Sequence, residues 1–302
     1  MKNRGTAVAA RMSFCFLVEE QYRRDGMPGE VAHRLRRWGH RVEVLRPGGE
    51  LLALNSLLHT GSHDAWVLKT VSGGPGLGLL EAAAATGLTT VNDARAIRGV
   101  RDKAAAAVIA AAAGLPVPPT WAAARLADLA RLPSARYPLV VKPADGSSGR
   151  GVHRVERPEE LLALAGEFAE TSLVIAQPYV PNSGVDLKVY CVGGRLYGTE
   201  RTSPLAGART APDRPVPLTA EVAEIAARIG EIFGLDLYGV DIVLGPDGPV
   251  VVDINDFPSF RKVPDAVETV AAAVIDLARN GSSHSRLCSA EQPGRIALAA
   301  QL

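Results

Sequence analysis

The sequence has 302 residues, 47% of them hydrophobic and 22% charged, which is typical of a folded enzyme with two domains or three small lobes. Its 33 Lys and Arg nearly balance its 32 Asp and Glu, so the charge supports neither a nucleic-acid partner nor a membrane partner. The apolar runs are too short to span a bilayer and residues 1–11 lack the apolar core of a secretion signal, so we expect a cytoplasmic protein. Three widely separated cysteines, without metal-ligand spacing, argue against disulfide and zinc sites.

The first third of the chain alternates between strand and helix patterns. Strands are expected at 12–18, 42–45, 65–69 and 89–91, and helices at 30–38 and 77–85. Such alternation predicts an α/β layer with parallel strands. An Ala-rich helix over 101–113, ended by Gly114 and Pro116, is expected to follow.

The pattern then changes to short strands joined by turns. Strands are expected at 139–142, 152–155, 173–179, 185–191 and 196–202, with one helix at 158–169. This spacing predicts an α+β region with mainly antiparallel pairing. A stretch rich in Pro, Gly and Arg at 203–218 predicts a mobile loop, and helices are expected at 219–233 and 264–278. Residues 281–302 show no clear period and are expected to form a flexible tail.

Two strands near the C-terminus, 238–244 and 250–255, alternate between apolar and polar residues. A five-residue loop at 245–249 would place Asp241 opposite Asp253. The period of two then predicts one apolar face, made of Val240, Ile242, Leu244, Val250, Val252 and Ile254. The other face carries Asp241, Asp253 and Asn255, whose oxygens suit Mg²⁺. A solvated sheet face is the alternative, but it would leave two like charges opposed, which destabilises a strand pair.

A glycine-rich segment at 145–151 separates two expected strands. Because a strand follows it, the segment is not a Walker P-loop. It can still fold over phosphates and present backbone N–H groups to them, and Lys142 just before it could reach a phosphate. The alternative is a flexible turn between two strands.

The strand that ends at Pro178 is a candidate purine site. The backbone of residues 178–180 would bind the edge of the ring while Ile175 packs on its face. Any buried strand that leaves a sheet has a similar pattern, so this signal gains weight only from its neighbours.

The dipeptide Gly193-Gly194 predicts a tight hairpin that pairs Asp186 with Arg201 and Lys188 with Thr199. The alternative is a ladder of surface ion pairs, which contribute about 0–1 kcal/mol each. We interpret the four side chains as a ribose and phosphate wall, because cations beside metal-binding carboxylates suit phosphoryl transfer.

Taken in order, five motifs resemble those of an ATP-grasp enzyme over residues 91–278. They are Asp102-Lys103, Lys142-Pro143, the 145–151 loop, the 177–180 strand end and Asp241 with Asp253-Ile254-Asn255. The resemblance implies an α/β preATP-grasp domain at 12–95, followed by two α+β lobes at 96–180 and 181–280. ATP would lie between the two lobes.

The resemblance also implies roles for individual residues. ATP would be bound by Lys103, Lys142, Ser147, Ser148, Gly149, Gly151, Ile175, Gln177, Tyr179, Val180, Asp186 and Lys188. Among these, Lys103 and Lys142 would contact phosphates and Asp186 the ribose. Two Mg²⁺ ions, with Mn²⁺ as an alternative, would be held by Asp241, Asp253 and Asn255. Lys142 and Arg201 would neutralise charge on the transferred phosphoryl group.

Two branches of that superfamily share features with the chain. The loop sequence at 146–151 is similar to that of ribosomal-protein S6 glutamate ligases and lysine-biosynthesis ligases, whereas residues 188–190 and 253–264 resemble inositol polyphosphate 5/6-kinases. The ligases usually carry Glu in place of Asp253 and Arg in place of Lys188, and the kinases carry a His-Gly element in place of the glycine loop.

We favour an ATP- and Mg-dependent ligase that joins a carboxylate to an amine through an acyl phosphate, because of the glycine loop. The alternatives are a small-molecule kinase that acts on a hydroxyl, and a non-catalytic nucleotide-binding module. The expected partner is a small-molecule or peptide substrate, and a homo-oligomer is compatible with the sequence.

Overall fold

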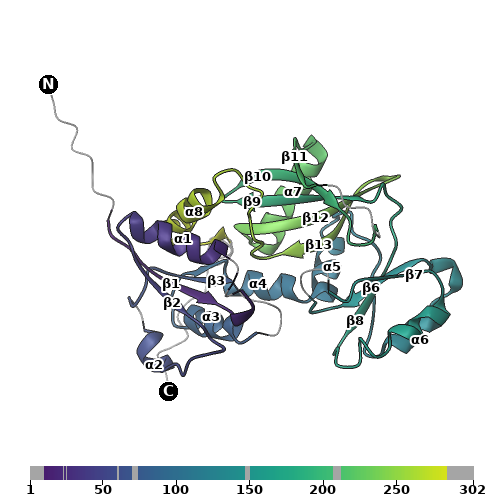
Figure 1. Ribbon diagram of the computed structural model, residues 1–302, viewed down its shortest axis with the longest axis horizontal. Coiled ribbons are helices and arrows are strands. Elements are labelled where there is room, and N and C mark those ends of the chain that lie inside the picture. Colours follow the sequence, from purple (N-terminus) through teal and green to yellow (C-terminus); the bar gives the residue numbers. More distant parts are fainter. Residues whose placement is uncertain are drawn as a thin grey trace, which may run out of the picture.

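The computed structural model describes residues 10–22, 24, 26–59, 61–69, 74–146, 150–206 and 212–283. Three β-sheets follow one another along the long axis of the molecule (Figure 1). No helix within these described ranges is both long and apolar enough to cross a membrane.

The N-terminal sheet is four-stranded and parallel, as predicted, in the order β2-β1-β3-β4. Its strands are β1 (Ser13–Val18), β2 (Arg41–Leu45), β3 (Ala65–Lys69) and β4 (Thr90–Val91). The helices of this region are α1 (Gly26–Arg37), α2 (Leu54–Leu57) and α3 (Gly76–Ala85). Five of the six residues of β1 are buried, as expected for a strand that is covered on both faces of a parallel sheet.

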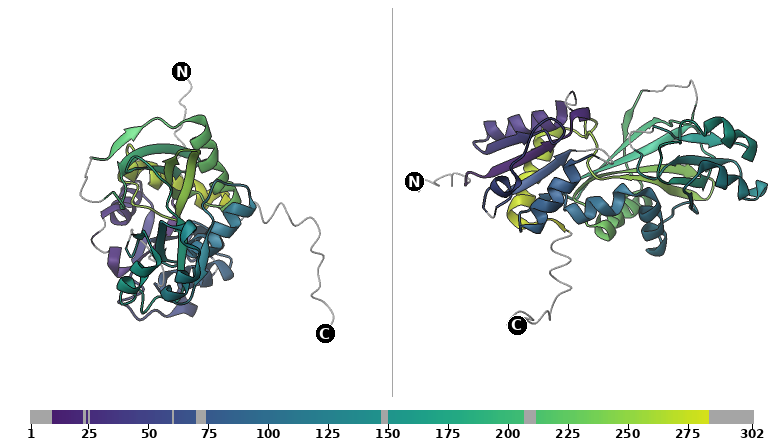
Figure 2. Two further views of the ribbon diagram at one scale, coloured as in Figure 1. Left: turned by 90° about the vertical axis from the view of Figure 1, so that its right-hand side faces the viewer. Right: turned by 90° about the horizontal axis from the view of Figure 1, so that it is seen from below.

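The last helix of the described chain, α8 (Ala266–Asn280), packs against α1 and completes the core on one face of the N-terminal sheet. Figure 1 and Figure 2 show α8 beside the N-terminal elements, far in sequence but close in space. The proposed domain limits at residues 95, 180 and 280 stay a prediction.

Two helices lie at residues 94–112, and the sequence predicted only the second of them, as a helix over 101–113. They are α4 (Ala94–Arg101) and α5 (Lys103–Ala112), separated by Asp102 in an extended conformation. The Asp102 carboxylate accepts hydrogen bonds from the backbone N–H groups of Ala104 and Ala105, which caps α5. Lys103 is therefore the first residue of α5 and lies at its N-terminal end.

The second sheet in chain order, called the central sheet below, lies at the end of the molecule opposite the N-terminal sheet (Figure 1) and is four-stranded and antiparallel, in the order β5-β8-β6-β7. Its strands are β5 (Trp121–Ala123), β6 (Leu139–Pro143), β7 (His153–Val155) and β8 (Val174–Pro178). The predicted helix at 158–169 is wrong in length, because only a 3₁₀ turn (Pro158–Glu160) and α6 (Leu161–Leu164) form. Gly166 has a low helix propensity and follows the point where the helix ends.

The third sheet is five-stranded and antiparallel, in the order β11-β10-β9-β12-β13. Its strands are β9 (Val185–Val192), β10 (Arg195–Thr202), β11 (Arg214–Val216), β12 (Leu237–Gly245) and β13 (Gly248–Asn255). Helix α7 (Ala220–Phe233) covers one face and shares a hydrophobic core with β9 and β12. The prediction of a loop over 203–218 is wrong at its end, where β11 pairs with β10; residues 207–211 lie outside the described residues.

The β12–β13 hairpin places Asp241 opposite Asp253, as predicted, but its loop is shorter than five residues because pairing extends to Gly245 and Gly248. The register shifts after Asp241, so Ile242 pairs with Val251. This β-bulge turns Val251 into the core and leaves Val252 beside the cavity. The predicted apolar face is therefore wrong at three positions, namely Val250, Val252 and Leu244, and the last is 53% exposed.

Candidate active site

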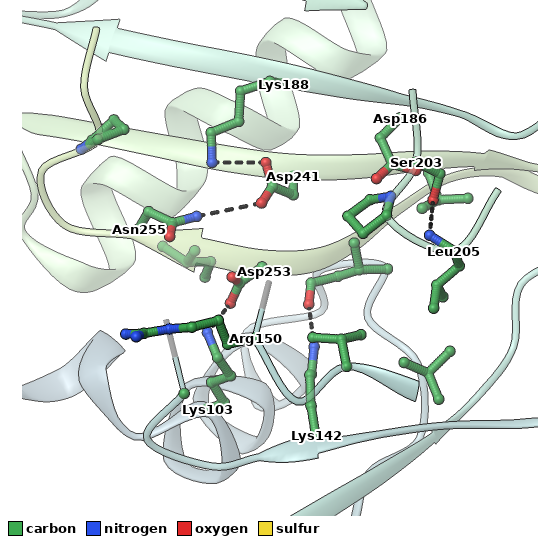
Figure 3. A pocket seen from close by; sticks show the side chains of 18 of the residues that line it. Lys103, Lys142, Arg150, Asp186, Lys188, Ser203, Leu205, Asp241, Asp253 and Asn255 are labelled. Atoms are coloured by element: carbon green, nitrogen blue, oxygen red, sulfur yellow. Dashed lines mark hydrogen bonds and ion pairs between the residues drawn. The ribbon is translucent and has the colours of Figure 1, made fainter. Parts of the chain in front are cut away.

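A cavity of about 460 Å³ lies between the central sheet and the five-stranded sheet. Eleven predicted site residues line it: Lys103, Lys142, Gln177, Tyr179, Val180, Asp186, Lys188, Arg201, Asp241, Asp253 and Asn255. Figure 3 shows the acidic side chains of the hairpin facing lysines from both directions. Residues brought together from segments 150 positions apart thus form one charged site.

The carboxylate of Asp241 lies among cations of its own sheet. Its Oδ1 lies 2.7 Å from Lys188 Nζ, and its Oδ2 lies 3.1 Å from Arg201 Nη2. Asn255 Nδ2 donates a hydrogen bond of 3.4 Å to Asp241 Oδ2. The predicted pairing of β9 with β10 is confirmed, and it is this register that delivers both cations to one carboxylate.

The carboxylate of Asp253 is contacted from the opposite side of the cavity, where Lys103 Nζ lies 2.5 Å from Oδ1. Burial opposes ionisation of Asp253, but the ammonium groups of Lys103, Lys142 and Lys188 outweigh it and hold its pKa below the usual range. Asp253 is therefore an anion at neutral pH. The repulsion expected between the two facing carboxylates is offset by Lys103 at Asp253 and by Lys188 and Arg201 at Asp241.

Lys142 crosses from the end of β6 to the hairpin. Its ammonium donates a 2.8 Å hydrogen bond to the carbonyl of Val252, the residue that the bulge leaves outside the core. Burial lowers the pKa of Lys142, the charge of Lys103 lowers it further, and Asp253 and Asp241 act in the opposite direction. The side chain thus directs a buried amino group at the edge of the carboxylate pair.

Asp186 lies further along β9, near Arg201. Burial raises the pKa of Asp186, against a hydrogen bond from Ser203 and the charge of Arg201, which lower it. Burial would lower the pKa of Arg201, but Asp241 and Asp186 raise it above its ordinary value. Within the described residues, Asp186 Oδ1 has no hydrogen-bond partner, so this oxygen is available to a ligand hydroxyl.

The donor set of the hairpin fits a hard divalent cation. Two carboxylates and one amide oxygen are the ligand types that Mg²⁺ takes from proteins, and Mg²⁺ completes its shell with water and phosphate. Among the residues that the structure describes, no group of three or more His, Cys, Asp or Glu is arranged for a metal. Asp241, Asp253 and Asn255 would therefore hold such an ion through a mixed set of donors.

The predicted purine side of the cavity contains the end of β8. Gln177 Nε2 donates to Thr120 Oγ1 over 2.9 Å, and Tyr179 N donates to the carbonyl of Pro138 over 2.9 Å. The guanidinium of Arg154 lies 3.9 Å from the centre of the Tyr179 ring and fixes its orientation. These contacts fix the position of the strand end at the wall of the cavity.

Two predicted nucleotide contacts stand apart from the main cavity. Ile175 is fully buried and lines a smaller adjoining cavity instead. Gly151 has φ +67° and is not among the residues that line the main cavity. Ser147, Ser148 and Gly149 lie outside the described residues.

Two cavity residues that lie next to the sequence motifs were not predicted. Arg101 directly precedes Asp102-Lys103, and Asp256 directly follows Asn255. Nor was a site role predicted for Tyr22, which lines the N-terminal end of the cavity with Lys69. The Lys69 ammonium lies 4.5 Å from the centre of the Tyr22 ring. Adjacency to a motif was the available signal for Arg101 and Asp256, whereas only the folded chain brings Tyr22 to the site.

Comparisons with known proteins agree with this geometry. The model of the RimK-like ATP-grasp domain matches residues 100–277. A curated relative, the probable alpha-L-glutamate ligase of Haemophilus influenzae (strain PittEE), is 24% identical over 269 residues, which cover 80% of this chain and 90% of the relative.

Two solved structures have a similar fold. The RimK domain protein ATP-grasp from Sphaerobacter thermophilus aligns with a TM-score of 0.67 at 22% identity, over 87% of this chain and 99% of that chain. D-alanine–D-alanine ligase from Bacillus anthracis, solved with ATP, aligns with a TM-score of 0.70 at 16% identity, over 93% and 99%. The predicted ATP-grasp fold is thereby confirmed, and the family model and the curated relative agree with the predicted ATP-dependent carboxylate–amine ligase. The chain belongs to the RimK-like ATP-grasp family.

Proposed function

We propose that this chain uses Mg-ATP to phosphorylate a carboxylate of a small-molecule or peptide substrate, and that an amine then displaces the phosphate to form an amide. The observation that carries the proposal is the pair of opposed carboxylates, Asp241 and Asp253, surrounded by Lys103, Lys142, Lys188 and Arg201 in one cavity. Fixed charges of both signs in a buried site suit phosphoryl transfer, because they stabilise charge without reorganisation of water.

Each side chain of the charged site has its own role in the proposed reaction. Lys142 and Arg201 place positive charge where the γ-phosphoryl group passes from ATP to the carboxylate, and Lys103 and Lys188 bind phosphate oxygens. The carboxylates of Asp241 and Asp253, with Asn255, would hold two Mg²⁺ ions, or Mn²⁺ as a substitute, which would supply positive charge for the triphosphate. The amine attacks the acyl carbon in the second step, and the C–O bond to phosphate breaks.

The nucleoside occupies the end of the cavity formed by Gln177, Tyr179 and Val180, with Asp186 on the ribose. Support comes from the buried Asp186 oxygen that has no hydrogen-bond partner among the described residues. Phosphate binding by the 145–151 loop, including Gly151, stays a prediction, and Ser147, Ser148 and Gly149 lie outside the described residues. Ile175 supports the adenine pocket from behind. Glutamate is the first amine to test, because the curated relative is named as a probable alpha-L-glutamate ligase.

The kinase alternative requires a strongly basic acceptor pocket. Lys69 lines the cavity, but Arg261 and Lys262 are not among the described residues that line it, and Lys262 Nζ lies 3.3 Å from Asp213 Oδ2. Arg209 lies outside the described residues. The charge at this end of the cavity therefore favours a carboxylate substrate over a polyphosphate.

Trapping with hydroxylamine tests the proposal. The protein is incubated with Mg-ATP, hydroxylamine and a panel of amino acids and short acidic peptides, and hydroxamate and free phosphate are measured. A ligase yields both in equal amounts, only with the right carboxylate, and the Asp253→Ala variant yields neither. A stable phosphoester without phosphate release would establish the kinase instead, and retained turnover by Asp253→Ala with Mg²⁺ would defeat the metal assignment. The cytoplasmic location and a homo-oligomer stay predictions.

A further inference from the structure

Two chain segments meet at one side of the cavity. One is the junction of α4 and α5, residues 101–103, and the other is the end of β13 with the residue after it, 253–256. Both carry predicted site residues, since Lys103 belongs to the first and Asp253 and Asn255 to the second. The relative position of these segments sets the distance between a phosphate-binding lysine and the metal donors.

A buried ion pair joins the same two segments. Arg101 Nε lies 3.0 Å from Asp256 Oδ1, and Arg101 Nη2 donates a 3.0 Å hydrogen bond to Asp256 Oδ2. Each side chain is 12% exposed, so water screens the pair weakly. Two contacts between a planar guanidinium and a carboxylate fix orientation as well as distance.

Asn92 hydrogen-bonds to the backbone of Asp256, just after the β12–β13 hairpin. Its fully buried side chain accepts hydrogen bonds from the N–H groups of Asp236 and Leu237, at 3.0 and 2.8 Å. It donates to the carbonyls of Leu237, at 2.7 Å, and of Asp256. One amide thus joins the first residue of β12 to the residue that follows β13.

The Lys103–Asp253 contact cannot hold the segments together once the site is loaded. Under the proposed function Lys103 binds phosphate and Asp253 binds the metal, so both groups turn to the ligand. The Arg101–Asp256 pair lies two residues from Lys103 and one residue from Asn255, and the proposed function assigns neither member to the ligand. The Arg101–Asp256 pair therefore keeps the distance between the two segments when the Lys103–Asp253 contact breaks.

We propose that Arg101 and Asp256, with Asn92 behind them, are positioning residues that hold Lys103 at the correct distance from the metal donors of β13. This inference rests on the proposed function and adds residues that act through Lys103, Asp253 and Asn255. It predicts that loss of the pair weakens binding of the metal–nucleotide complex, in addition to any effect on stability.

The experiment compares Asp256→Asn and Arg101→Met with a matched control, Arg98→Met. Arg98 lies one turn earlier on α4 and makes a similar two-point contact with Glu81, at 2.8 and 2.7 Å, but on the exposed surface and outside the cavity. Calorimetry measures the dissociation constant of Mg-ADP, steady-state kinetics give kcat and KM for ATP, and thermal unfolding gives Tm. We expect Mg-ADP to bind at least about tenfold more weakly to the two pair variants and within about twofold of wild type to Arg98→Met.

The double variant Arg101→Met/Asp256→Asn separates positioning from general damage. If the pair acts as a unit, the double variant loses no more Mg-ADP affinity than either single variant. Additive losses, or unchanged Mg-ADP affinity and kcat in folded Asp256→Asn, would overturn the inference. If Asp256→Asn does not fold, Arg101→Lys, which keeps the charge but loses the planar fork, carries the same comparison. Wild-type protein that does not bind Mg-ADP would refute the proposed function itself, so the two failures are distinguishable.

Discussion

The two sheets that line the cavity handle charge in different ways. The five-stranded sheet contains both signs of charge, and Asp241 is paired with Lys188 and Arg201 from its own strands. The central sheet supplies Lys142, whose ammonium reaches a carbonyl on the other sheet. One side of the site is thus assembled within a single sheet, whereas the other side depends on how the two sheets meet. Substitutions in the two sheets should therefore fail in different ways.

The largest effect is expected from Asp241→Asn on β12. It removes a metal donor and leaves the buried Lys188 and the partly exposed Arg201 without their carboxylate, so kcat should fall by about 10²–10³-fold or more and the free energy of unfolding by about 1–3 kcal/mol. Steady-state kinetics and thermal denaturation measure the two losses. Asp247→Asn, in the exposed loop of the same hairpin, is the matched control and should match wild type. Normal turnover by Asp241→Asn would remove this residue from the metal site.

Lys142→Met on the central sheet should reduce kcat by about 10²-fold with little change in Tm, because methionine keeps the buried stem but not the charge. Since burial lowers the pKa of Lys142, the ammonium loses its proton at lower pH than an exposed lysine does. Activity should therefore decline with rising pH through this lowered pKa. Lys142→Arg should retain part of the activity and move the decline to higher pH, as measured in kcat–pH profiles. Identical kcat–pH profiles for wild type and Lys142→Arg would exclude Lys142 as the titrating group.

Gly239→Ala tests the close packing inside the five-stranded sheet. A Cβ at this position would lie 2.9 Å from Lys188 Cε and 3.1 Å from Pro258 Cγ, so the Lys188 side chain must shift from its present position beside Asp241. We expect kcat/KM to fall by about tenfold, which corresponds to about 1.4 kcal/mol. Gly78→Ala in α3, where an added Cβ meets nothing within 4 Å, is the control and should leave kinetics unchanged. Equal kinetics for the two variants would show that Lys188 is not held against Asp241.

The smallest loss of function is expected from Asp186→Asn. Unlike the other variants, this one should be more stable than wild type at pH 7. Burial raises the pKa of Asp186 in the folded protein, so its favourable contribution is present below the unfolded-state pKa of about 4 and is lost as pH rises through the folded pKa. The asparagine variant should therefore have a higher Tm than wild type at pH 7, and the difference should shrink toward pH 4. Nucleotide affinity should fall severalfold through the lost ribose contact. A lower Tm at pH 7 would show that Asp186 is stabilised as an anion.

Local pattern predicted the parts of the site that depend on strand period and turn type. The Gly193-Gly194 turn fixes the β9–β10 register, and alternation places Asp241 and Asp253 on the same face. The bulge could not be predicted, because an extra residue at Val252 interrupts alternation without a residue type that marks it. It is nevertheless what exposes the Val252 carbonyl to Lys142.

Contacts between segments that are distant in the sequence also could not be predicted. Arg101 and Asp256 are each next to a recognised motif, yet 155 positions separate them and no spacing rule relates one to the other. The helix before Asp102, α4, was missed for a local reason, because its sequence contains Gly99, which has a low helix propensity, and lacks an alanine run like that of α5. The cap that Asp102 provides is visible only when the backbone of α5 is in place.

Under the proposed function, both sheets close on one metal–nucleotide complex. Calorimetric titration of a non-hydrolysable ATP analogue, with and without Mg²⁺, into wild type and Asp253→Asn tests this arrangement. We expect Mg²⁺ to tighten binding to wild type by at least about tenfold and to have no such effect on Asp253→Asn, because the variant lacks an anionic donor. Binding to wild type that is the same with and without Mg²⁺, or an Asp253→Asn protein that keeps the full Mg²⁺ effect, would contradict the account.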